Sequence, residues 1–284
     1  MSLKWMGLAV PLVSWQLFAH AQGIPGAASA IVAAPNGLAH IALRVSDLDA
    51  EVNFFGKLGF QKAFVDSGNN GRPLEIIVKV NDEEFIQLYP ADPKQPLGFM
   101  HASYEAQDAK ALNARAVSAG LKPTPVQQDG VGDLWFTVAD PDGRPTEFTQ
   151  YLASSRQASD SGQHLGSDRI SDELLGIELP VKDIGAAQRF YAAVGFVVST
   201  EGASVRLSLP GNPDFRIVLR QATANAQAQF LLPIDDARKT EDELQSAGVQ
   251  VQRSNKLVFV RDGDGNSFVL LETGDHSPRH AGRK

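Results

Sequence analysis

The sequence contains no cysteine among its 284 residues. Disulfide-stabilised scaffolds, thiolate zinc sites and cysteine nucleophiles are therefore excluded, and any bound metal must be held by His, Asp or Glu. The sequence also has fewer basic than acidic residues. It contains 26 Lys and Arg and 33 Asp and Glu, which gives a net charge of -7. A nucleic acid or an anionic membrane is not expected as the main partner, since binding phosphates requires a basic surface.

The N-terminal segment also lacks an apolar run long enough to span a membrane. Lys4 is followed by an apolar stretch that Pro11 and Gln16 interrupt, and then by Ala-His-Ala at 19–21. A basic start, a short apolar core and a small-x-small site are typical of a secretory signal. We predict a signal peptide over 1–21, export to a periplasmic or extracellular location, and no stable membrane insertion after cleavage; an uncleaved anchor is the alternative.

Four segments of the chain repeat the same spacing of landmark residues. In each, a strand residue is followed seven positions later by Asp and nineteen positions later by Gly. The four sets are His40, Asp47 and Gly59; His101, Asp108 and Gly120; Gly176, Asp183 and Gly195; and Gln229, Asp236 and Gly248. Because Asp commonly begins a helix and Gly commonly ends one, each set predicts a strand, an amphipathic helix and then further strands.

The four units pair into two domains. We place the first domain over 37–152 and the second over 172–274, joined by a polar, helix-poor linker over 153–171. Residues 22–36 are small and interrupted by Pro and Gly, which predicts a flexible leader, and residues 275–284 form a polar tail that we expect to be mobile.

The paired units, the opening HIALRVSDLD and the ending DPDGxxxE resemble the vicinal oxygen chelate superfamily. That superfamily contains glyoxalase I, extradiol dioxygenases, fosfomycin-resistance enzymes and bleomycin-resistance binding proteins. The resemblance is strong over about 37–152 and weaker over about 173–273. It implies an α+β fold in which tandem pairs of βαβββ units form two cupped mixed sheets, each around a cleft. The fold alone does not determine the reaction.

Alternation along the strands of the first domain selects the side chains of its cleft. Apolar residues at every second position are expected to pack beneath the helices. The residues between them, which include His40, Gln87, His101 and Glu147, then point into the cleft. The superfamily places its metal ligands at these four positions.

His40 and His101 are the only histidines inside the predicted units, because the other four lie in the signal, the linker and the tail. Two imidazoles and a carboxylate leave coordination positions open, as in non-haem Fe(II) sites, and Mn, Co, Ni or Zn would accept the same donors. We predict His40, His101 and Glu147 as metal ligands, Glu147 also as the catalytic residue, and Gln87 as a fourth ligand or an outer hydrogen-bonding partner. The alternative is that two interior histidines form hydrogen bonds without a metal.

The second domain serves as an internal comparison. The repeat maps the four cleft positions to Gly176, Val218, Gln229 and Val269, which cannot replace the metal ligands. We predict that the second domain is a degenerate copy, which closes over the first domain, shapes its pocket or mediates association. Association through this domain would give a homodimer. Binding of an apolar ligand without metal is the alternative.

Other residues have weaker assignments. Phe85, Tyr89 and Trp135 alternate toward the cleft, where they form an aromatic wall for the substrate or serve in packing alone. The Asp-Gly phrases at 140–143 and 262–265 predict tight turns rather than calcium sites.

These features favour a divalent-metal-dependent enzyme that acts on a small molecule chelating through two neighbouring oxygens. We favour a dioxygenase-like reaction because of the His-His-Glu set, although the resembled dioxygenases carry an extra His and a Tyr near the position of Thr137. A glyoxalase-like isomerase or lyase is the alternative; it usually has a carboxylate at the position of Gln87 and uses a thiol cosubstrate, which is not expected outside the cytoplasm. A metal-free binding protein of the bleomycin-resistance kind is the alternative from another class.

Overall fold

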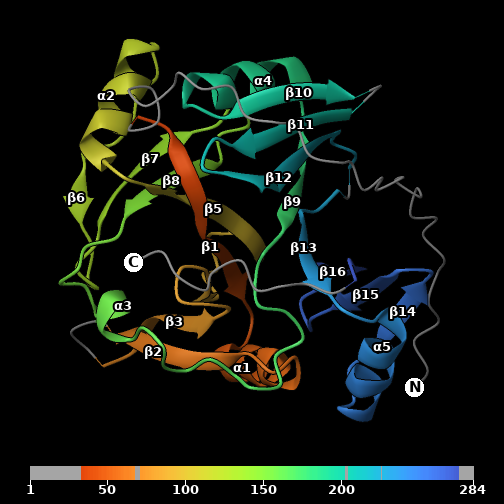
Figure 1. Ribbon diagram of the computed structural model, residues 1–284. Helices are drawn as coiled ribbons and strands as arrows, with labels where there is room; N and C mark the ends of the chain where they lie inside the picture. The colour runs from red at the N-terminus through yellow and green to blue at the C-terminus, as the bar shows by residue number, and fades with distance from the viewer. Residues whose placement is uncertain (1–32, 68–70, 202–203, 225, 275–284) are drawn as a thin grey trace.

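The strands of the computed structural model form two eight-stranded mixed sheets (Figure 1). The structure describes residues 33–67, 71–201, 204–224 and 226–274. The segments predicted as a signal peptide and as a polar tail lie outside these residues, as does most of the predicted leader. Within the described ranges, no helix is long and apolar enough to cross a membrane.

The first sheet is built from the two N-terminal units. Its elements are β1 (Pro35–Val45), α1 (Leu48–Lys57), β2 (Gln61–Ser67), β3 (Pro73–Lys79), β4 (Phe85–Pro90), β5 (Gly98–Ala106), α2 (Ala109–Ser118), β6 (Gln127–Gln128), β7 (Leu134–Ala139) and β8 (Pro145–Gln150). The strand order is β2-β3-β4-β1-β5-β8-β7-β6, with β1 parallel to β4 and antiparallel to β5. The units therefore join along β1 and β5. β1 begins at Pro35 and so includes the last two residues of the expected leader.

The second sheet repeats this plan. Its elements are β9 (Gly176–Val181), α4 (Ile184–Ala193), β10 (Val197–Glu201), β11 (Ser204–Leu209), β12 (Asn212–Gln221), β13 (Gln229–Ile234), α5 (Ala237–Ser246), β14 (Val251–Ser254), β15 (Leu257–Arg261) and β16 (Ser267–Glu272). The order β10-β11-β12-β9-β13-β16-β15-β14 matches that of the first sheet strand for strand. The predicted α+β fold with tandem paired units is confirmed.

The repeated Asp and Gly residues mark the ends of the four ten-residue helices. Each Asp is the N-cap, and its side chain accepts hydrogen bonds from backbone N–H groups of the first turn, which have no partner within the helix. The four glycines follow the helix ends with φ of 82° (Gly59), 80° (Gly120), 105° (Gly195) and 76° (Gly248). This left-handed conformation favours glycine, so the repeat reflects local backbone requirements.

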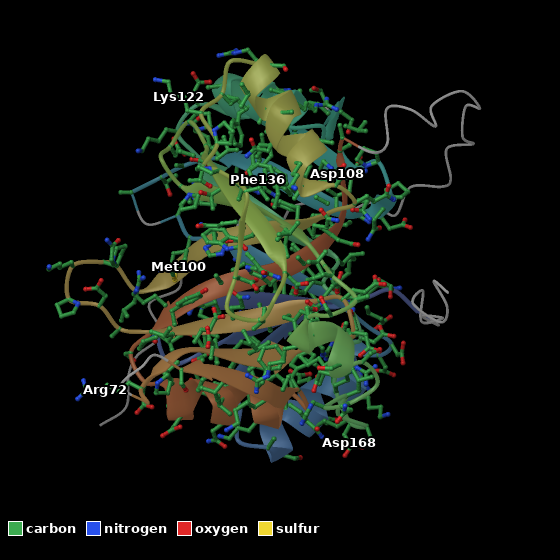
Figure 2. All side chains as sticks on the ribbon, turned by 90° about the vertical axis from the view of Figure 1, so that its left-hand side faces the viewer. Arg72, Met100, Asp108, Lys122, Phe136 and Asp168 are labelled. Carbon is green, nitrogen blue, oxygen red and sulfur yellow. The ribbon has the colours of Figure 1, made fainter. Side chains whose placement is uncertain are left out.

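One apolar core lies between the two sheets. It includes Leu43 and Tyr104 of the first sheet as well as Phe215 and Phe268 of the second. The ring of Phe268 packs against Phe55 of α1, with centroids 5.5 Å apart, and Tyr104 packs against Phe215 at 6.2 Å. Figure 2 shows the buried Phe136 among the interior side chains, whereas Lys122 lies at the outer edge of the molecule. Each sheet has two faces, one packed against this shared core and one turned away from it. We call the face turned away from the shared core the inner face of the sheet.

Two equivalent turns attach each sheet to the other. Asp142, between β7 and β8, accepts a hydrogen bond from the backbone N–H of Lys182 at 3.0 Å. Asp264, between β15 and β16, accepts one from the backbone N–H of Ser46 at 2.7 Å. Gly143 and Gly265 lie in these turns with φ of 85° and 89°. The Asp-Gly phrases therefore form tight turns, as predicted, and the turns dock the domains on one another.

The segment between the domains packs along the first sheet. It contains the short helix α3 (Arg156–Ser159). Arg156 Nη1 donates to the carbonyl of Val65 in β2 at 3.2 Å, and its backbone N–H donates to that of Val131, just before β7, at 2.8 Å. β2 is the first strand in the order and β7 is next to last, so this segment bridges opposite sides of a curled sheet.

A buried lysine anchors the same segment. Lys79 of β3 has a side chain that is 1% exposed, and its Nζ lies 2.8 Å from Asp82 Oδ1 and 3.0 Å from Asp160 Oδ2. Nζ also donates to the carbonyl oxygen of Asp160 at 2.6 Å. His164 of the same segment places Nδ1 2.7 Å from Asp160 Oδ1.

Lys79→Met is expected to lower the free energy of unfolding by about 3 kcal/mol, because Asp160 then stays buried without its cation. Urea unfolding measures this change, and limited proteolysis should show faster cleavage between 153 and 171. Lys62→Met is the matched control on the exposed part of β2, with an expected change within about 0.5 kcal/mol. Equal stability of the two variants would contradict the anchoring role of Lys79.

Candidate metal centre

Three strands at the middle of the first sheet carry the predicted metal ligands. His40 lies on β1, His101 on β5 and Glu147 on β8. Their neighbours Ile41 and Phe148 are fully buried in the shared core, so the ligands lie on the inner face. Pairing of β1 with β5 and of β5 with β8 brings the three side chains together from separate parts of the chain.

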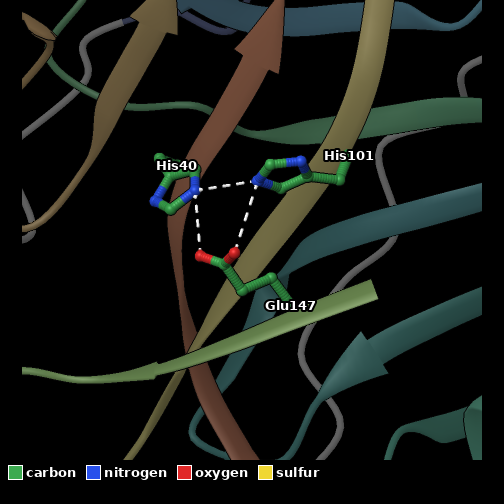
Figure 3. A group of neighbouring side chains, drawn as sticks. All are labelled: His40, His101 and Glu147. Carbon is green, nitrogen blue, oxygen red and sulfur yellow. Dashed lines mark hydrogen bonds and ion pairs between the residues drawn. The ribbon is translucent and has the colours of Figure 1, made fainter. Parts of the chain in front are cut away.

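The three side chains converge on one point (Figure 3). His40 Nε2 lies 3.3 Å from His101 Nε2 and 3.3 Å from Glu147 Oε1. His101 Nε2 lies 3.6 Å from Glu147 Oε2. One ligand atom from each residue can be chosen so that all lie within 4.8 Å of one another. Within the described ranges, no other group of three or more His, Asp or Glu side chains has this geometry.

The protonation states fit a divalent cation. Burial lowers the pKa of His101 to about 4, although Glu147 opposes this effect, so its imidazole is neutral and keeps a lone pair at neutral pH. Burial alone would raise the pKa of Glu147, but the two imidazoles and a hydrogen bond from Ser103 lower it to about 2. The site thus offers imidazole nitrogens and one carboxylate, a donor set that suits Fe(II), Mn, Co, Ni or Zn.

Buried hydroxyl groups hold the carboxylate in place. Thr149 Oγ1 donates to Glu147 Oε1 at 3.3 Å, and it lies 2.8 Å from Ser103 Oγ. Both hydroxyl residues are buried on the inner face. Such outer hydrogen bonds fix the orientation of a metal-binding side chain.

Gln87 is held by a neighbour on its own strand. The hydroxyl of Tyr89 donates to Gln87 Oε1 at 3.1 Å, and this amide oxygen is the atom that would bind a metal. We predicted Gln87 as either a fourth metal ligand or an outer hydrogen-bonding partner. This contact favours the outer hydrogen-bonding partner.

The other predicted cleft residues lie on the inner face but differ in surroundings. Phe85 is buried in a small apolar cluster with Phe64 and Ile77, which agrees with the packing alternative. Trp135 is half-buried and lies opposite Thr149 on the neighbouring strand β8. A role of these aromatic residues in substrate binding stays a prediction.

Sequence reasoning missed one acidic residue of this face. Glu75 of β3 is half-buried and lies within electrostatic range of His40 and Glu147. Burial is the main reason that its pKa is raised, and a hydrogen bond with Tyr89 opposes the rise. Its signal was present in the sequence, since an acidic residue in the apolar strand PLEIIVK stands at an inner-face position.

The second sheet confirms the alignment of the two halves. Gly176 lies opposite Arg216 as His40 lies opposite Phe85, and Val269 lies opposite Leu231 as Glu147 lies opposite Ser103. At the four equivalent positions the structure therefore places Gly176, Val218, Gln229 and Val269, which cannot form the same metal site.

Comparisons with known proteins agree with this architecture. Residues 37–148 match the family model described as Glyoxalase/Bleomycin resistance protein/Dioxygenase superfamily. Curated protein sequences give no match.

Solved structures with similar folds include two kinds of enzyme. A catechol 2,3-dioxygenase has 18% identity and a TM-score of 0.65, covering 87% of this chain and 91% of its own. The Mn(II)-bound glyoxalase from Novosphingobium aromaticivorans has 17% identity and a TM-score of 0.65, with coverage of 84% and 82%. The 2,3-dioxygenase LapB from Pseudomonas sp. KL28 has 15% identity and a TM-score of 0.61, with coverage of 87% and 95%. At these identities the similarity establishes the fold alone.

Proposed function

We propose, from the match of residues 37–148 to the model of the glyoxalase/bleomycin resistance protein/dioxygenase superfamily, that the protein is a divalent-metal-dependent enzyme. Its substrate is a small molecule that chelates the metal through two neighbouring oxygens. The observation that carries this proposal is the convergence of His40, His101 and Glu147 on one buried point.

The chain's own residues have separate tasks in this proposal. His40 and His101 would hold the metal through Nε2, and Glu147 through one carboxylate oxygen. The bound metal would supply Lewis-acid or oxygen-activating chemistry. The hydroxyls of Thr149 and Ser103 keep the carboxylate oriented, and burial of the site limits access of water to the reacting atoms.

A dioxygenase-like reaction on a catechol-type substrate is our first choice, because two His and one Glu are the usual donors for non-haem Fe(II). The position at which the resembled dioxygenases carry a Tyr is near Thr137, which lies opposite Glu147 in the sheet. The substrate's proton would therefore have to be taken by another group on this chain.

A glyoxalase-like isomerase or lyase is the second candidate, and Glu75 is the observation that favours it. Such an enzyme usually has a carboxylate where this chain has Gln87. Glu75 supplies a carboxylate on the strand beside Gln87, within electrostatic range of Glu147. A metal-free binding protein is less well supported, because sequestering an apolar ligand does not require two imidazoles and a carboxylate at one point.

Metal analysis tests the proposal directly. Protein purified anaerobically without an affinity tag is expected to contain about one equivalent of metal, and the His40→Ala/His101→Ala variant almost none, because two of three ligands are lost. His164→Ala is the matched control, since this histidine bonds to Asp160 outside the site and its loss should leave the metal content unchanged.

The identity of the metal then selects the reaction to assay. Iron or manganese would support screening of catechols and α-keto compounds under oxygen, whereas nickel, cobalt or zinc would support isomerase or lyase assays. Absence of metal from the wild-type protein after reconstitution would overturn the proposal in favour of a binding protein.

A further inference from the structure

Three arginines surround one buried residue on the inner face of the second sheet. That residue is Val218 of β12, at the position equivalent to Gln87. Arg206 of β11 lies directly opposite Val218, and Arg216 and Arg220 are two residues away from it in either direction along β12. Because residues two apart in a strand share a face, the three arginines lie on the inner face with Val218. The residues between them on β12 belong to the shared core: Phe215, Ile217 and Leu219.

Positive charge exceeds negative charge in this part of the sheet. Across β9, β11 and β12 the acidic residues are Glu178 and the exposed Asp214, against three arginines. Glu178 Oε1 lies 2.6 Å from Arg220 Nε, so this arginine has a carboxylate partner within the sheet. The arginines are half-buried, and their attraction for an anion is less screened by water than that of surface arginines. In a chain with a net charge of -7, this local excess favours a negatively charged ligand.

Gly176 allows Arg216 to lie against the centre of this face. Gly176 is opposite Arg216 in the parallel pair of β9 and β12, and it occupies the position equivalent to His40. A Cβ atom on Gly176 would collide with the backbone carbonyl oxygen of Arg216 and would lie 3.1 Å from Arg216 Cγ. The stem of Arg216 therefore lies beside the position at which the first sheet carries an imidazole. The change from His to Gly thus removes a metal ligand and makes room for an arginine.

The other half of the same inner face is apolar. Leu231 of β13 and Val269 of β16 are buried in a small cluster with Leu175. Three half-buried residues pack against this cluster: Leu257, Phe259 and Leu271. In Figure 1, β10, β11 and β12 lie on one side of the sheet and β14, β15 and β16 on the other, with β9 and β13 between them. Leu231 lies opposite Gly176, so the arginines and the apolar cluster meet at the centre of the face.

We propose that the inner face of the second sheet binds a small organic acid. Its carboxylate lies against Arg206 and Arg216, and its apolar body lies against the cluster around Leu231 and Val269. A guanidinium group can donate two parallel hydrogen bonds to a carboxylate, and the cluster removes the apolar body from water. An inorganic anion would leave the apolar half uncovered, and an uncharged ligand would leave the arginines without an added partner. The inference goes beyond the proposed function, because it concerns the other sheet and requires no metal.

The test uses 4-phenylbutyrate as the probe and compares it with the uncharged 4-phenylbutyramide and with acetate. Calorimetric titration of the chelator-treated full chain should give a Kd of about 1 mM or lower for 4-phenylbutyrate. The amide should bind at least about tenfold more weakly, because it lacks the charge that strengthens hydrogen bonds from arginine. Acetate should also bind at least about tenfold more weakly, because it has no apolar body to bury.

Two arginine variants place the probe on this face. Arg216→Gln and Arg206→Gln should each weaken binding of 4-phenylbutyrate by at least about tenfold, since each removes a charged donor. They lie on different strands, so one keeps the test open if circular dichroism shows that the other has not folded. Arg238→Gln, at an exposed position of α5, is the matched control and should leave the affinity within about twofold. The His40→Ala/His101→Ala variant should bind the probe as the wild type does, because its substitutions lie in the first sheet.

The possible results lead to different conclusions. Equal affinities for the acid and the amide, or unchanged affinity in both arginine variants, would overturn the inference. Loss of binding in His40→Ala/His101→Ala would also overturn it, because the probe would then bind at the metal centre. Binding of inorganic phosphate as tight as that of 4-phenylbutyrate would contradict a site for organic acids.

Absence of binding would be equally decisive. If 4-phenylbutyrate, benzoate and octanoate all fail to bind at about 10 mM, the inner face of the second sheet is not a carboxylate site. Weaker binding in both arginine variants together with full binding in the histidine variant would support the proposal. These results leave the metal content of the protein untested, so the inference and the proposed function can fail separately.

Discussion

Glu147→Gln is expected to lower the affinity for the divalent metal by at least about 100-fold and to abolish turnover. Loss of an outer hydrogen-bonding partner already costs about 10- to 100-fold in metal affinity, and loss of a direct ligand should cost at least the upper value. The amide keeps the shape of the side chain but removes the only negative charge among the three donors. Calorimetric titration of the metal-free protein with Zn(II) or Mn(II) measures the effect.

Asp66→Asn is the matched control for Glu147→Gln. It removes a carboxylate from β2 in the same sheet, away from the convergence point, and metal affinity should stay within about twofold. Glu147→Asp should fall between the two, because it keeps the charge but not the reach. Full metal affinity in Glu147→Gln would show that Glu147 is not a ligand.

Glu51→Gln is expected to stabilise the protein at and above neutral pH. Glu51 lies on α1 and is 3% exposed, and its Oε1 has no hydrogen-bond partner. Burial, together with Asp262 and Asp264, raises its pKa to about 9. The folded protein therefore holds a proton on Glu51 that the unfolded chain releases above about pH 4.5, and stability falls as pH rises from 4.5 to 9.

The glutamine side chain of Glu51→Gln does not ionise, so this pH dependence is lost. Its amide N–H group can still donate a hydrogen bond to Asp262. We expect Glu51→Gln to be more stable than wild type by about 2–3 kcal/mol at pH 8, seen as a rise in Tm of about 5 °C, with little difference at pH 4.5. Thermal unfolding by circular dichroism at both pH values measures this change. Glu243→Gln, on an exposed position of α5, is the control and should change stability by no more than about 0.5 kcal/mol. A Tm difference that does not vary with pH would contradict a protonated Glu51.

Comparison of the two docking turns explains why Glu51 carries a proton. In the first turn, Arg144 lies 3.8 Å from Asp140 and 3.4 Å from Asp142, so the acidic groups have a cation. In the second turn, Asn266 occupies the position of Arg144. Asp262 there accepts hydrogen bonds from the backbone N–H groups of Asp264 and Asn266 and from the side-chain amide of Asn266. The proton on Glu51 keeps this side chain neutral beside Asp262 and Asp264, whereas in the first turn Arg144 supplies a positive charge.

Local signals account for most of what the sequence predicted correctly. The Asp caps and the glycines with positive φ depend on a few consecutive residues, so their spacing identifies the four helices without any knowledge of packing. Strand alternation likewise placed His40, His101 and Glu147 on one face. Their convergence required only that the strands pair in the order that the repeats imply.

Residues whose roles depend on distant partners were not predicted. Lys79 and Glu75 are charged residues in an apolar strand, but their partners come from the linker and from β4. Glu51 is an acidic residue of an amphipathic helix, and its surroundings arise only when the second sheet docks on α1. Sequence patterns specify the faces of each element, whereas these contacts depend on how the elements meet.

Opposite faces of the same strands have different roles in the first sheet. One face packs in the shared core and stabilises the fold, and the other carries the candidate metal ligands. Phe268 of the second sheet covers Phe55 of α1, so the first domain depends on its duplicate for part of its packing. Val269, at the position equivalent to Glu147, packs with Leu175 and Leu231 in a small cluster separate from this core. After duplication, the second copy could therefore lose its ligands while it was retained as a scaffold, and its inner face stays free to acquire a different specificity.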